Sequence, residues 1–308
     1  LAINHDTQAA VIEMGMSGFG EIRELALAAK PQIGVITNIG VSHMEYLGSR
    51  ENILKAKLEL AECLPDGATL FLCSDNDLLK TVEIPRLNVV FYGVDSEKAK
   101  IKGTVTHSTP TQTDFTISFD GRQWAASIPG TGIHLVQNAL AAFGIGLEFG
   151  MEPQAAIKAL SDYRPAGMRQ NIVDCKGITI VEDCYNASPD SLSAALRTLA
   201  ELPCTGKRYA VLSDMLELGT LAHEGHRECG ELAAHCADVL LLWGDFAADY
   251  AEGAQAQGIG RVEILQSKDD LAELLAKELR AGDVAWFKAS RGMALEECIE
   301  ELYHKIGC

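Results

Sequence analysis

The chain has 308 residues, with 26 Lys and Arg against 43 Asp and Glu, and its formal net charge is −17. This length predicts two domains, since a domain usually holds roughly 100 to 200 residues. The acidic balance argues against a nucleic-acid partner, because phosphate backbones are bound by clustered Lys and Arg. No apolar run reaches the roughly 18 residues of a membrane-spanning helix, so no membrane insertion is expected. The nine cysteines include no C-x-x-C pair and are interpreted as the free thiols of a cytoplasmic protein.

The first half of the chain alternates short apolar strands with helices. The predicted strands are Gln8 to Met14, Ile33 to Asn38, Ala68 to Cys73 and Asn88 to Tyr92. Helices are predicted from Glu21 to Lys30 and from an N-cap at Ser49 to about Leu64. This alternation predicts a parallel sheet flanked by helices.

A change of period follows in the middle of the chain. Between about Ile101 and Ile128 the apolar residues recur every second position around Asp120-Gly121, which predicts a small antiparallel insert with a hairpin turn. Helices are predicted at 133–149 and 153–161, and the stretch 164–167 (Arg-Pro-Ala-Gly) is the expected hinge. We therefore expect domains at 1–166 and 167–308.

The second half returns to strand and helix alternation. Strands are predicted at 178–181, 209–212, 239–242, 262–265 and 284–287, with helical segments between them. Such a pattern is typical of an open, doubly wound, Rossmann-like α/β domain.

Lys57 has an unusual place on the predicted helix 49–64. At about 100° per residue it falls within an apolar stripe, while Lys55, Glu59 and Glu62 face the other way. A buried ammonium group is costly, so such a lysine is paired, reaches the rim of the buried face, or is chemically altered.

Two further polar residues follow predicted strands. Glu13 closes the first strand and His43 comes shortly after the second. Because functional groups of open parallel sheets gather at the carboxyl ends of the strands, Glu13, His43 and Lys57 are expected to meet in one crevice. His223 and His226 have no third ligand nearby in the sequence, so we do not interpret them as a metal pair.

Several ordered motifs resemble those of the Mur ligases. The motif sequences are similar to those of the branch of that family that adds D-alanyl-D-alanine to UDP-N-acetylmuramoyl-tripeptide. The resemblance extends over essentially the whole chain. The motifs are EMGMSGFGEI from Glu13, ITNIGVSH from Ile36, AKLE from Ala56, NALAA from Asn138, EDCYNASP from Glu182, SDMLELG from Ser213 and KASRGM from Lys288.

The resemblance implies a fold and a reaction. It implies part of the central ATPase domain followed by the Rossmann-like ligase domain, in a cytoplasmic monomer of peptidoglycan precursor synthesis. The expected enzyme is an ATP-dependent amide-bond ligase that acts through an acyl phosphate. Its expected partners are UDP-N-acetylmuramoyl-tripeptide, D-alanyl-D-alanine and ATP.

The resemblance also implies roles for individual residues. Glu13, His43 and Lys57 would be catalytic and would hold Mg²⁺, with Lys57 carbamylated; a carbamate is an anionic oxygen ligand of the kind that Mg²⁺ prefers. Nucleotide binding would fall to Asn138, Arg169, Asp183, Tyr185 and Asn186. Substrate contacts would fall to Asp214, His226, Lys288, Ser290 and Arg291.

Three departures from the family pattern affect the expected activity. No G-x-x-x-x-G-K-[ST] loop occurs, and Gly206-Lys207 is no substitute because position 201 is Glu201. No domain that would grip the UDP-sugar precedes Glu13, and Leu135 stands where the family usually has asparagine. We therefore expect a truncated ligase that turns over poorly or not at all alone. A Mur-type ligase with another acceptor, or a non-catalytic nucleotide- or dipeptide-binding fragment, are the alternatives.

Overall fold

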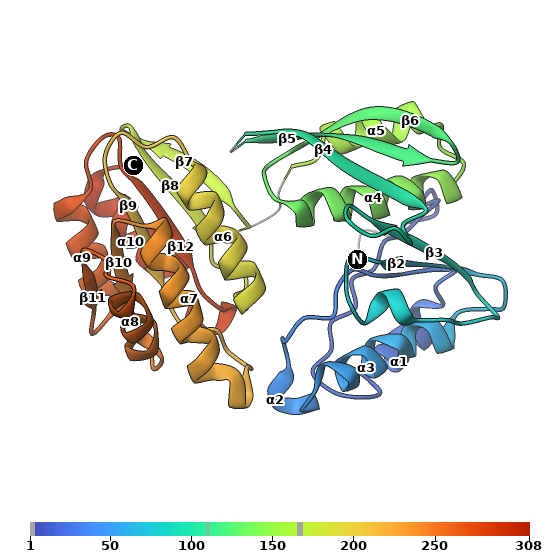
Figure 1. Cartoon of the computed structure of the whole chain (residues 1–308), viewed down its shortest axis with the longest axis horizontal. Helices are drawn as coiled ribbons and strands as arrows, with labels where there is room; N and C mark the ends of the chain where they lie inside the picture. Colours follow the sequence, from blue (N-terminus) through green and yellow to red (C-terminus); the bar gives the residue numbers. More distant parts are fainter. Residues whose placement is uncertain (1–3, 110, 165–168) are drawn as a thin grey trace.

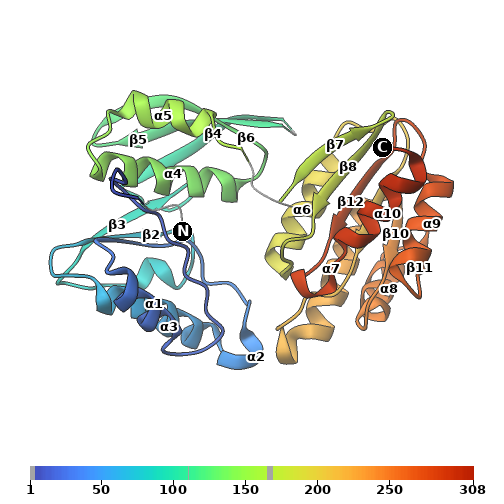
Figure 2. The same ribbon diagram turned by 180° about the vertical axis from the view of Figure 1, so that it is seen from behind.

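The protein forms two units, each built on a six-stranded sheet (Figure 1). The computed structural model describes residues 4–109, 111–164 and 169–308. The two units lie side by side both in Figure 1 and in the view from behind (Figure 2). This is the expected α/β class, while positions 165–167 of the predicted hinge lie outside the described residues.

The first sheet has the strand order β1-β2-β3-β4-β5-β6. Its strands are β1 (Ile33–Ile36), β2 (Thr69–Cys73), β3 (Asn88–Gly93), β4 (Ile101–Thr109), β5 (Gln112–Phe119) and β6 (Arg122–Pro129). Strands β1 to β4 are parallel, and β4, β5 and β6 are antiparallel. The predicted hairpin at Asp120-Gly121 is confirmed, and both residues have positive φ, 47° and 71°. The antiparallel strands extend the same sheet, because β4 pairs with the edge of β3.

Helices cover both faces of this sheet. They are α1 (Glu21–Ala29), α2 (Met44–Leu47), α3 (Arg50–Cys63), α4 (Ile133–Glu148) and α5 (Pro153–Ser161), with a 3-10 turn η1 (Leu79–Thr81). The N-cap prediction for α3 is confirmed, since the Ser49 side chain accepts a hydrogen bond from the Asn52 amide at 3.2 Å. Packing is close on both sides: a Cβ on Gly34 would lie 2.9 Å from Leu64 of α3's C-cap, and one on Gly144 of α4 would lie 2.6 Å from Phe71.

The prediction of a strand at Gln8 to Met14 is wrong. This segment has no regular secondary structure, and Val11 is 92% exposed. An apolar run becomes a strand only when a neighbouring edge takes its backbone hydrogen bonds. Here a cavity lies between the segment and β1, so this pairing is not made.

The second sheet has the order β11-β10-β9-β12-β8-β7. Its strands are β7 (Asn171–Cys175), β8 (Ile178–Asp183), β9 (Arg208–Leu212), β10 (Val239–Leu242), β11 (Val262–Ile264) and β12 (Val284–Lys288). The five predicted strands are confirmed and run parallel, whereas β7 is an additional antiparallel edge strand that the periodicity did not indicate.

Helices of the second unit divide between the two faces of its sheet. Helices α6 (Pro189–Glu201), α7 (Ala222–Cys236) and α8 (Ala247–Ala256) bury apolar side chains on one face. Helices α9 (Lys268–Glu278) and α10 (Glu296–Ile306) cover the other face. Short 3-10 turns follow β9 and β12, η2 (Gly219–Leu221) and η3 (Arg291–Met293). The arrangement is doubly wound, as predicted.

The interpretation of all cysteines as free thiols is wrong for one pair. Cys175 at the end of β7 forms a disulfide with Cys308, with a Cα–Cα distance of 5.8 Å. The two residues are 133 positions apart, so sequence spacing did not reveal the bond. Across the described ranges, no helix is long and apolar enough to cross a membrane.

Candidate functional site

Lys57 and Glu13 line the same cavity of the first unit. The cavity has a volume of about 620 Å³ and lies between the segment 8–14, strand β1 and the carboxyl end of α4. Thr37, just beyond β1, joins Lys57 and Glu13 in its lining. The structure therefore brings together two of the three residues expected to act on a metal.

Lys57 lies half-buried on α3, and few polar groups surround its side chain. Its Nζ donates a hydrogen bond to the Asn38 carbonyl at 2.8 Å. Burial lowers the pKa of Lys57, since the surroundings disfavour the charged ammonium. A lysine of this kind has a larger neutral fraction, and the neutral amine is the form that reacts with carbon dioxide. The environment thus fits carbamylation.

Glu59, predicted to face away from the apolar stripe of α3, is not exposed to solvent. Its side chain is buried at 5% exposure and accepts hydrogen bonds from the Gly20 amide at 2.8 Å and the Arg23 amide at 3.2 Å. These amides belong to the first turn of α1, whose free N–H groups attract a carboxylate. Glu59 therefore joins α3 to the start of α1.

His43 faces the second unit. It precedes α2 with a φ of 64°, and its Nδ1 lies 2.5 Å from Oε2 of Glu217. It is not among the residues that line the cavity of Lys57 and Glu13. Within the described residues, no group of three or more His, Cys, Asp and Glu side chains could hold a metal ion. A complete metal site would need the lysine-derived ligand or groups from a substrate.

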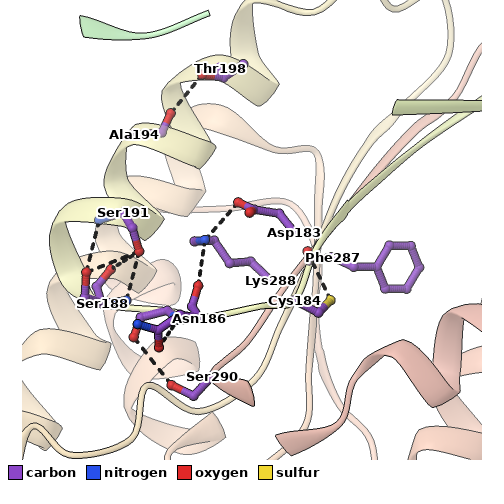
Figure 3. Close-up of polar contacts among 11 residues, drawn as sticks. Asp183, Cys184, Asn186, Ser188, Ser191, Ala194, Thr198, Phe287, Lys288 and Ser290 are labelled. Carbon is purple, nitrogen blue, oxygen red and sulfur yellow. Dashed lines mark hydrogen bonds and ion pairs between the residues drawn. The ribbon is translucent and has the colours of Figure 1, made fainter. Parts of the chain in front are cut away.

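A buried ion pair forms the centre of the site in the second unit (Figure 3). Asp183 ends β8 and Lys288 ends the adjacent strand β12, so their side chains meet at the carboxyl edge of the sheet. The Lys288 Nζ donates to Asp183 Oδ2 at 2.8 Å and to the Asn186 carbonyl at 3.0 Å. Burial raises the pKa of Asp183, and the neighbouring Lys288 opposes that shift.

The loop after β8 leads into the start of α6 at this edge. Ser188 caps the helix: its hydroxyl accepts from the Ser191 amide, and the Ser191 hydroxyl accepts from the Ser188 amide at 2.9 Å. Ser290, two residues beyond β12, approaches the Ala187 carbonyl at 3.4 Å (Figure 3). Lys288 and Ser290 therefore hold this loop in place.

Asp214 and His226 are enclosed by the protein. The Asp214 carboxylate accepts from the amides of Asp245 at 2.9 Å and Phe246 at 3.1 Å. His226 is 0% exposed; its Nε2 accepts from the Met215 amide at 2.9 Å and its Nδ1 bonds the Ala222 carbonyl at 2.6 Å. Both ring nitrogens are thus engaged by main-chain groups, and burial lowers the pKa of His226. In this structure the two residues shape the 214–219 loop, and neither faces open space.

The remaining predicted residues are exposed at the rims of the two units. Arg169 stacks on the ring of Tyr185, with its guanidinium carbon 4.1 Å from the ring centroid. Arg291 pairs with Glu296 at 2.5 Å, and Asn138 lies exposed on α4. These side chains are accessible to a ligand, whereas Lys288 is committed to Asp183.

Two family models together match most of the chain. Residues 2–146 match the Mur ligase middle domain, and residues 168–291 match the glutamate ligase domain of the Mur ligases. The chain belongs to the Mur ligase family. The two matches correspond to the two sheets. Of the Mur ligase motifs found in the sequence, those beginning at Ala56 and Asn138 lie within α3 and α4, and the motifs beginning at Glu182, Ser213 and Lys288 lie at the carboxyl ends of β8, β9 and β12 and in the loops that follow.

Curated relatives are longer than this chain. It is 39% identical over 312 residues to the UDP-N-acetylmuramoyl-tripeptide–D-alanyl-D-alanine ligase of Bacillus subtilis, covering 98% of this chain and 66% of the relative. The ligase of the same name from Treponema pallidum is 30% identical, with 98% and 64% covered. The chain therefore spans about two thirds of the length of these Mur ligases.

Solved structures of Mur ligases have the same fold. MurF from Acinetobacter baumannii superposes with a TM-score of 0.86 at 24% identity, covering 98% of this chain and 66% of that protein. MurF from Thermotoga maritima in complex with ADP gives a TM-score of 0.80 at 25% identity, covering 96% and 66%.

Proposed function

We propose that this chain carries ATP-binding and amine-binding parts of a ligase that adds D-alanyl-D-alanine to UDP-N-acetylmuramoyl-tripeptide. The 39% identity to a ligase of that name over 98% of the chain is the observation that carries this proposal. The exposed side chains at the rims of the two units and the cavity lined by Lys57 and Glu13 support the proposal. Residues 1–166 would form the ATP-binding part and 167–308 the ligase part. Cytoplasmic location and a monomeric state stay predictions.

The reaction would proceed in two balanced steps. An oxygen of the tripeptide carboxylate forms a bond to the γ-phosphorus of ATP, and the bond to the β,γ-bridging oxygen breaks to release ADP. The amine of D-alanyl-D-alanine then attacks the acyl phosphate carbon, loses a proton, and expels phosphate as the amide forms. Positioning and charge neutralisation dominate such phosphoryl transfer.

Lys57 is proposed to react with carbon dioxide. Its neutral Nζ would form a bond to the carbon, one C=O bond would become a C–O⁻, and a proton would leave to solvent. The carbamate would join Glu13 and His43 as a ligand of Mg²⁺, whose chemistry is to neutralise charge on the phosphates. The cavity shared by Lys57 and Glu13 and the lowered pKa of Lys57 support this assignment.

Nucleotide binding is proposed for the exposed side chains at the rims. Arg169, stacked on Tyr185, offers a cation to a phosphate or ribose, and Asn138 offers an amide to the base. Asp183 and Asn186 complete the expected set, with Asp183 held by Lys288. Arg291 is the exposed cation proposed to bind the dipeptide carboxylate. The buried residues hold the loops that would form the substrate site; they are Asp214, His226, Lys288 and Ser290.

Carbamylation can be tested by carbon-13 NMR with labelled bicarbonate. The wild-type chain should show a carbamate signal that Lys57→Ala abolishes. Lys55→Ala is the matched control, because Lys55 is exposed on the same helix and should leave the signal unchanged. A signal that survives in Lys57→Ala would contradict the assignment.

Nucleotide binding can be tested by calorimetric titration of MgATP. Arg169→Ala should weaken binding about tenfold, since a hydrogen bond to a charged group contributes about 1.5 to 3 kcal/mol. Arg197→Ala is the control, because Arg197 is exposed on α6 of the same unit and has no proposed role in binding. The acceptor is tested separately, by mass spectrometry of products from UDP-N-acetylmuramoyl-tripeptide with a panel of dipeptides and amino acids. Ligation of another acceptor in preference to D-alanyl-D-alanine would refute the proposed specificity.

A further inference from the structure

Three polar residues follow β2, which lies between β1 and β3 in the first sheet. They are Asp75, Asn76 and Asp77, and each is bonded to different elements of the unit. The Asn76 amide donates to Oδ1 of Asn38, which follows β1, at 2.8 Å. Asp77 accepts a hydrogen bond from Arg50 of α3 at 2.8 Å. Asp75 is bonded instead to the turn after β3 and to α4, and no part of the function proposed above uses it.

The Asp75 carboxylate is half-buried and accepts four hydrogen bonds. Nε2 of Gln137 on α4 donates at 2.7 Å, and three main-chain amides donate at 2.7, 3.0 and 2.9 Å; they belong to Val94, Asp95 and Ser96. Burial by itself would raise the pKa of Asp75, but these hydrogen bonds outweigh it and the pKa is lowered. The carboxylate is therefore ionised at neutral pH, and its bond to Gln137 is of the stronger, charge-assisted kind.

The start of α4 depends on this bond. Its N-cap residue is Gly132, which has no side chain to accept from the free amides of the first turn. In the ranges that the structure describes, the bond from Gln137 to Asp75 is the only hydrogen bond formed by a side chain of α4. Val136 and Leu140 bury the apolar face of the helix, but apolar packing has no preferred direction. The bond to Asp75 therefore supplies the directional contact that fixes the first turns of α4.

The residue after Gln137 is Asn138, whose side chain is exposed. His134 lies four positions before Asn138, so the two share one face of the helix. Loss of surrounding water lowers the pKa of His134, and the charges of Asp183 and Lys288 also act on it, in opposite directions. The first turns of α4 therefore lie near the buried ion pair of the second unit, where the proposed nucleotide site is.

We propose that Asp75 is a positioning residue for recognition of the nucleotide base, because through Gln137 it fixes the part of α4 that carries Asn138. This inference rests on the proposed function, in which Asn138 offers its amide to the base. An asparagine amide can pair with both the amino group and N7 of adenine, whereas guanine has a carbonyl oxygen in place of that amino group. Hydrogen bonds weaken steeply when their angle is poor, so this discrimination requires a fixed helix start. Asp75 itself makes no contact with the base.

Hydrogen exchange of the full chain without nucleotide tests the link to α4. Gln137→Leu removes the bond and leaves the Asp75 carboxylate its three main-chain donors. The amides of residues 134–138 should then exchange about tenfold faster, as expected for the loss of a hydrogen bond to a charged group. Gln112→Leu is the matched control, because Gln112 on β5 donates to Asp114 at the same distance of 2.7 Å. It should leave exchange in α4 unchanged.

The preference for ATP over GTP is the readout of positioning. In calorimetric titrations the wild-type chain should bind MgATP about ten times more tightly than MgGTP. Gln137→Leu and Asp75→Asn should reduce this ratio to about threefold or less, whereas purely structural damage would weaken both nucleotides alike. Asp77→Asn and Gln112→Leu are the controls and should keep the wild-type ratio. In an Asn138→Ala background, Gln137→Leu should reduce the ratio no further, because both changes act through the same amide.

The outcomes separate this inference from the proposed function. Unchanged exchange in Gln137→Leu would overturn the role of Asp75, whether or not the chain binds nucleotide. Faster exchange with an unchanged ratio of ATP to GTP affinity would overturn it too, because Asp75 would then only stabilise the helix; in both cases MgATP binding by the wild type would leave the proposed function standing. A wild-type chain that binds neither nucleotide would refute the proposed function, and this inference with it.

Discussion

Lys288→Met should destabilise the second unit strongly and in a pH-dependent way. The change keeps most of the aliphatic stem and removes the Nζ that donates to Asp183 Oδ2 and to the Asn186 carbonyl. The side chains of Lys288 and Asp183 are only 4% and 9% exposed, so water cannot replace the lost cation. Removal of one member of a buried pair typically costs about 3 to 5 kcal/mol, a large part of the ~5 to 15 kcal/mol that stabilises a domain.

The sign of the pH dependence follows from Asp183. Burial raises its pKa in the folded chain, and Lys288 opposes that rise. Without Lys288 the pKa rises further, so the folded variant binds a proton more readily than the unfolded chain. The variant's stability should therefore fall as pH rises from the unfolded value of about 3.9 through the folded pKa. We expect the gap from wild type to be small near pH 4 and full near pH 7.

Urea denaturation followed by tryptophan fluorescence at several pH values measures this gap. Lys305→Met is the control, because Lys305 pairs with Glu301 on the exposed side of α10 and should cost less than about 1 kcal/mol. The double variant Asp183→Asn with Lys288→Met should recover part of the loss. A gap below about 1 kcal/mol at pH 7, or one that is constant from pH 4 to 7, would refute the reasoning.

Three other substitutions test the packing. Glu59→Ala should cost about 1 to 2 kcal/mol in urea denaturation, because it leaves two amides at the start of α1 without their acceptor; an unchanged midpoint would contradict this. Gly230→Ala should lower the melting temperature, since its Cβ would lie 2.1 Å from the Tyr250 carbonyl oxygen, and overpacking costs about 1 to 3 kcal/mol. Cys308→Ser should lose about 2 to 4 kcal/mol under oxidising conditions, and a reductant should bring the wild type to the same stability.

The short sequence motifs predicted where many residues of the candidate site lie on the strands and helices. The motifs around Asp183, Lys288 and Lys57 place functional residue types after strands or on an apolar helix face, and parallel strands bring their carboxyl ends to one edge. The contacts that these side chains make in the folded protein were not predictable from the motifs. Lys288 was expected to meet a substrate carboxylate, yet it is buried against Asp183, and His226 bonds main-chain groups with both nitrogens. Glu217 lies within a recognised motif, but no sequence signal pairs it with His43.

The amino-acid sequence by itself determined the class of fold, the periodic helices and strands, the hairpin at Asp120-Gly121 and the cap at Ser49, because each depends on neighbours a few positions apart. The tertiary structure decided that 8–14 is not a strand, that Glu59 caps α1, that Cys175 bonds Cys308, and that Glu217 meets His43. These contacts join groups 36 or more positions apart, so they exist only once the sheets and helices have packed. Local periodicity cannot specify which surfaces will pack together. The hydrogen bonds and ion pairs that each of these side chains makes depend on that packing.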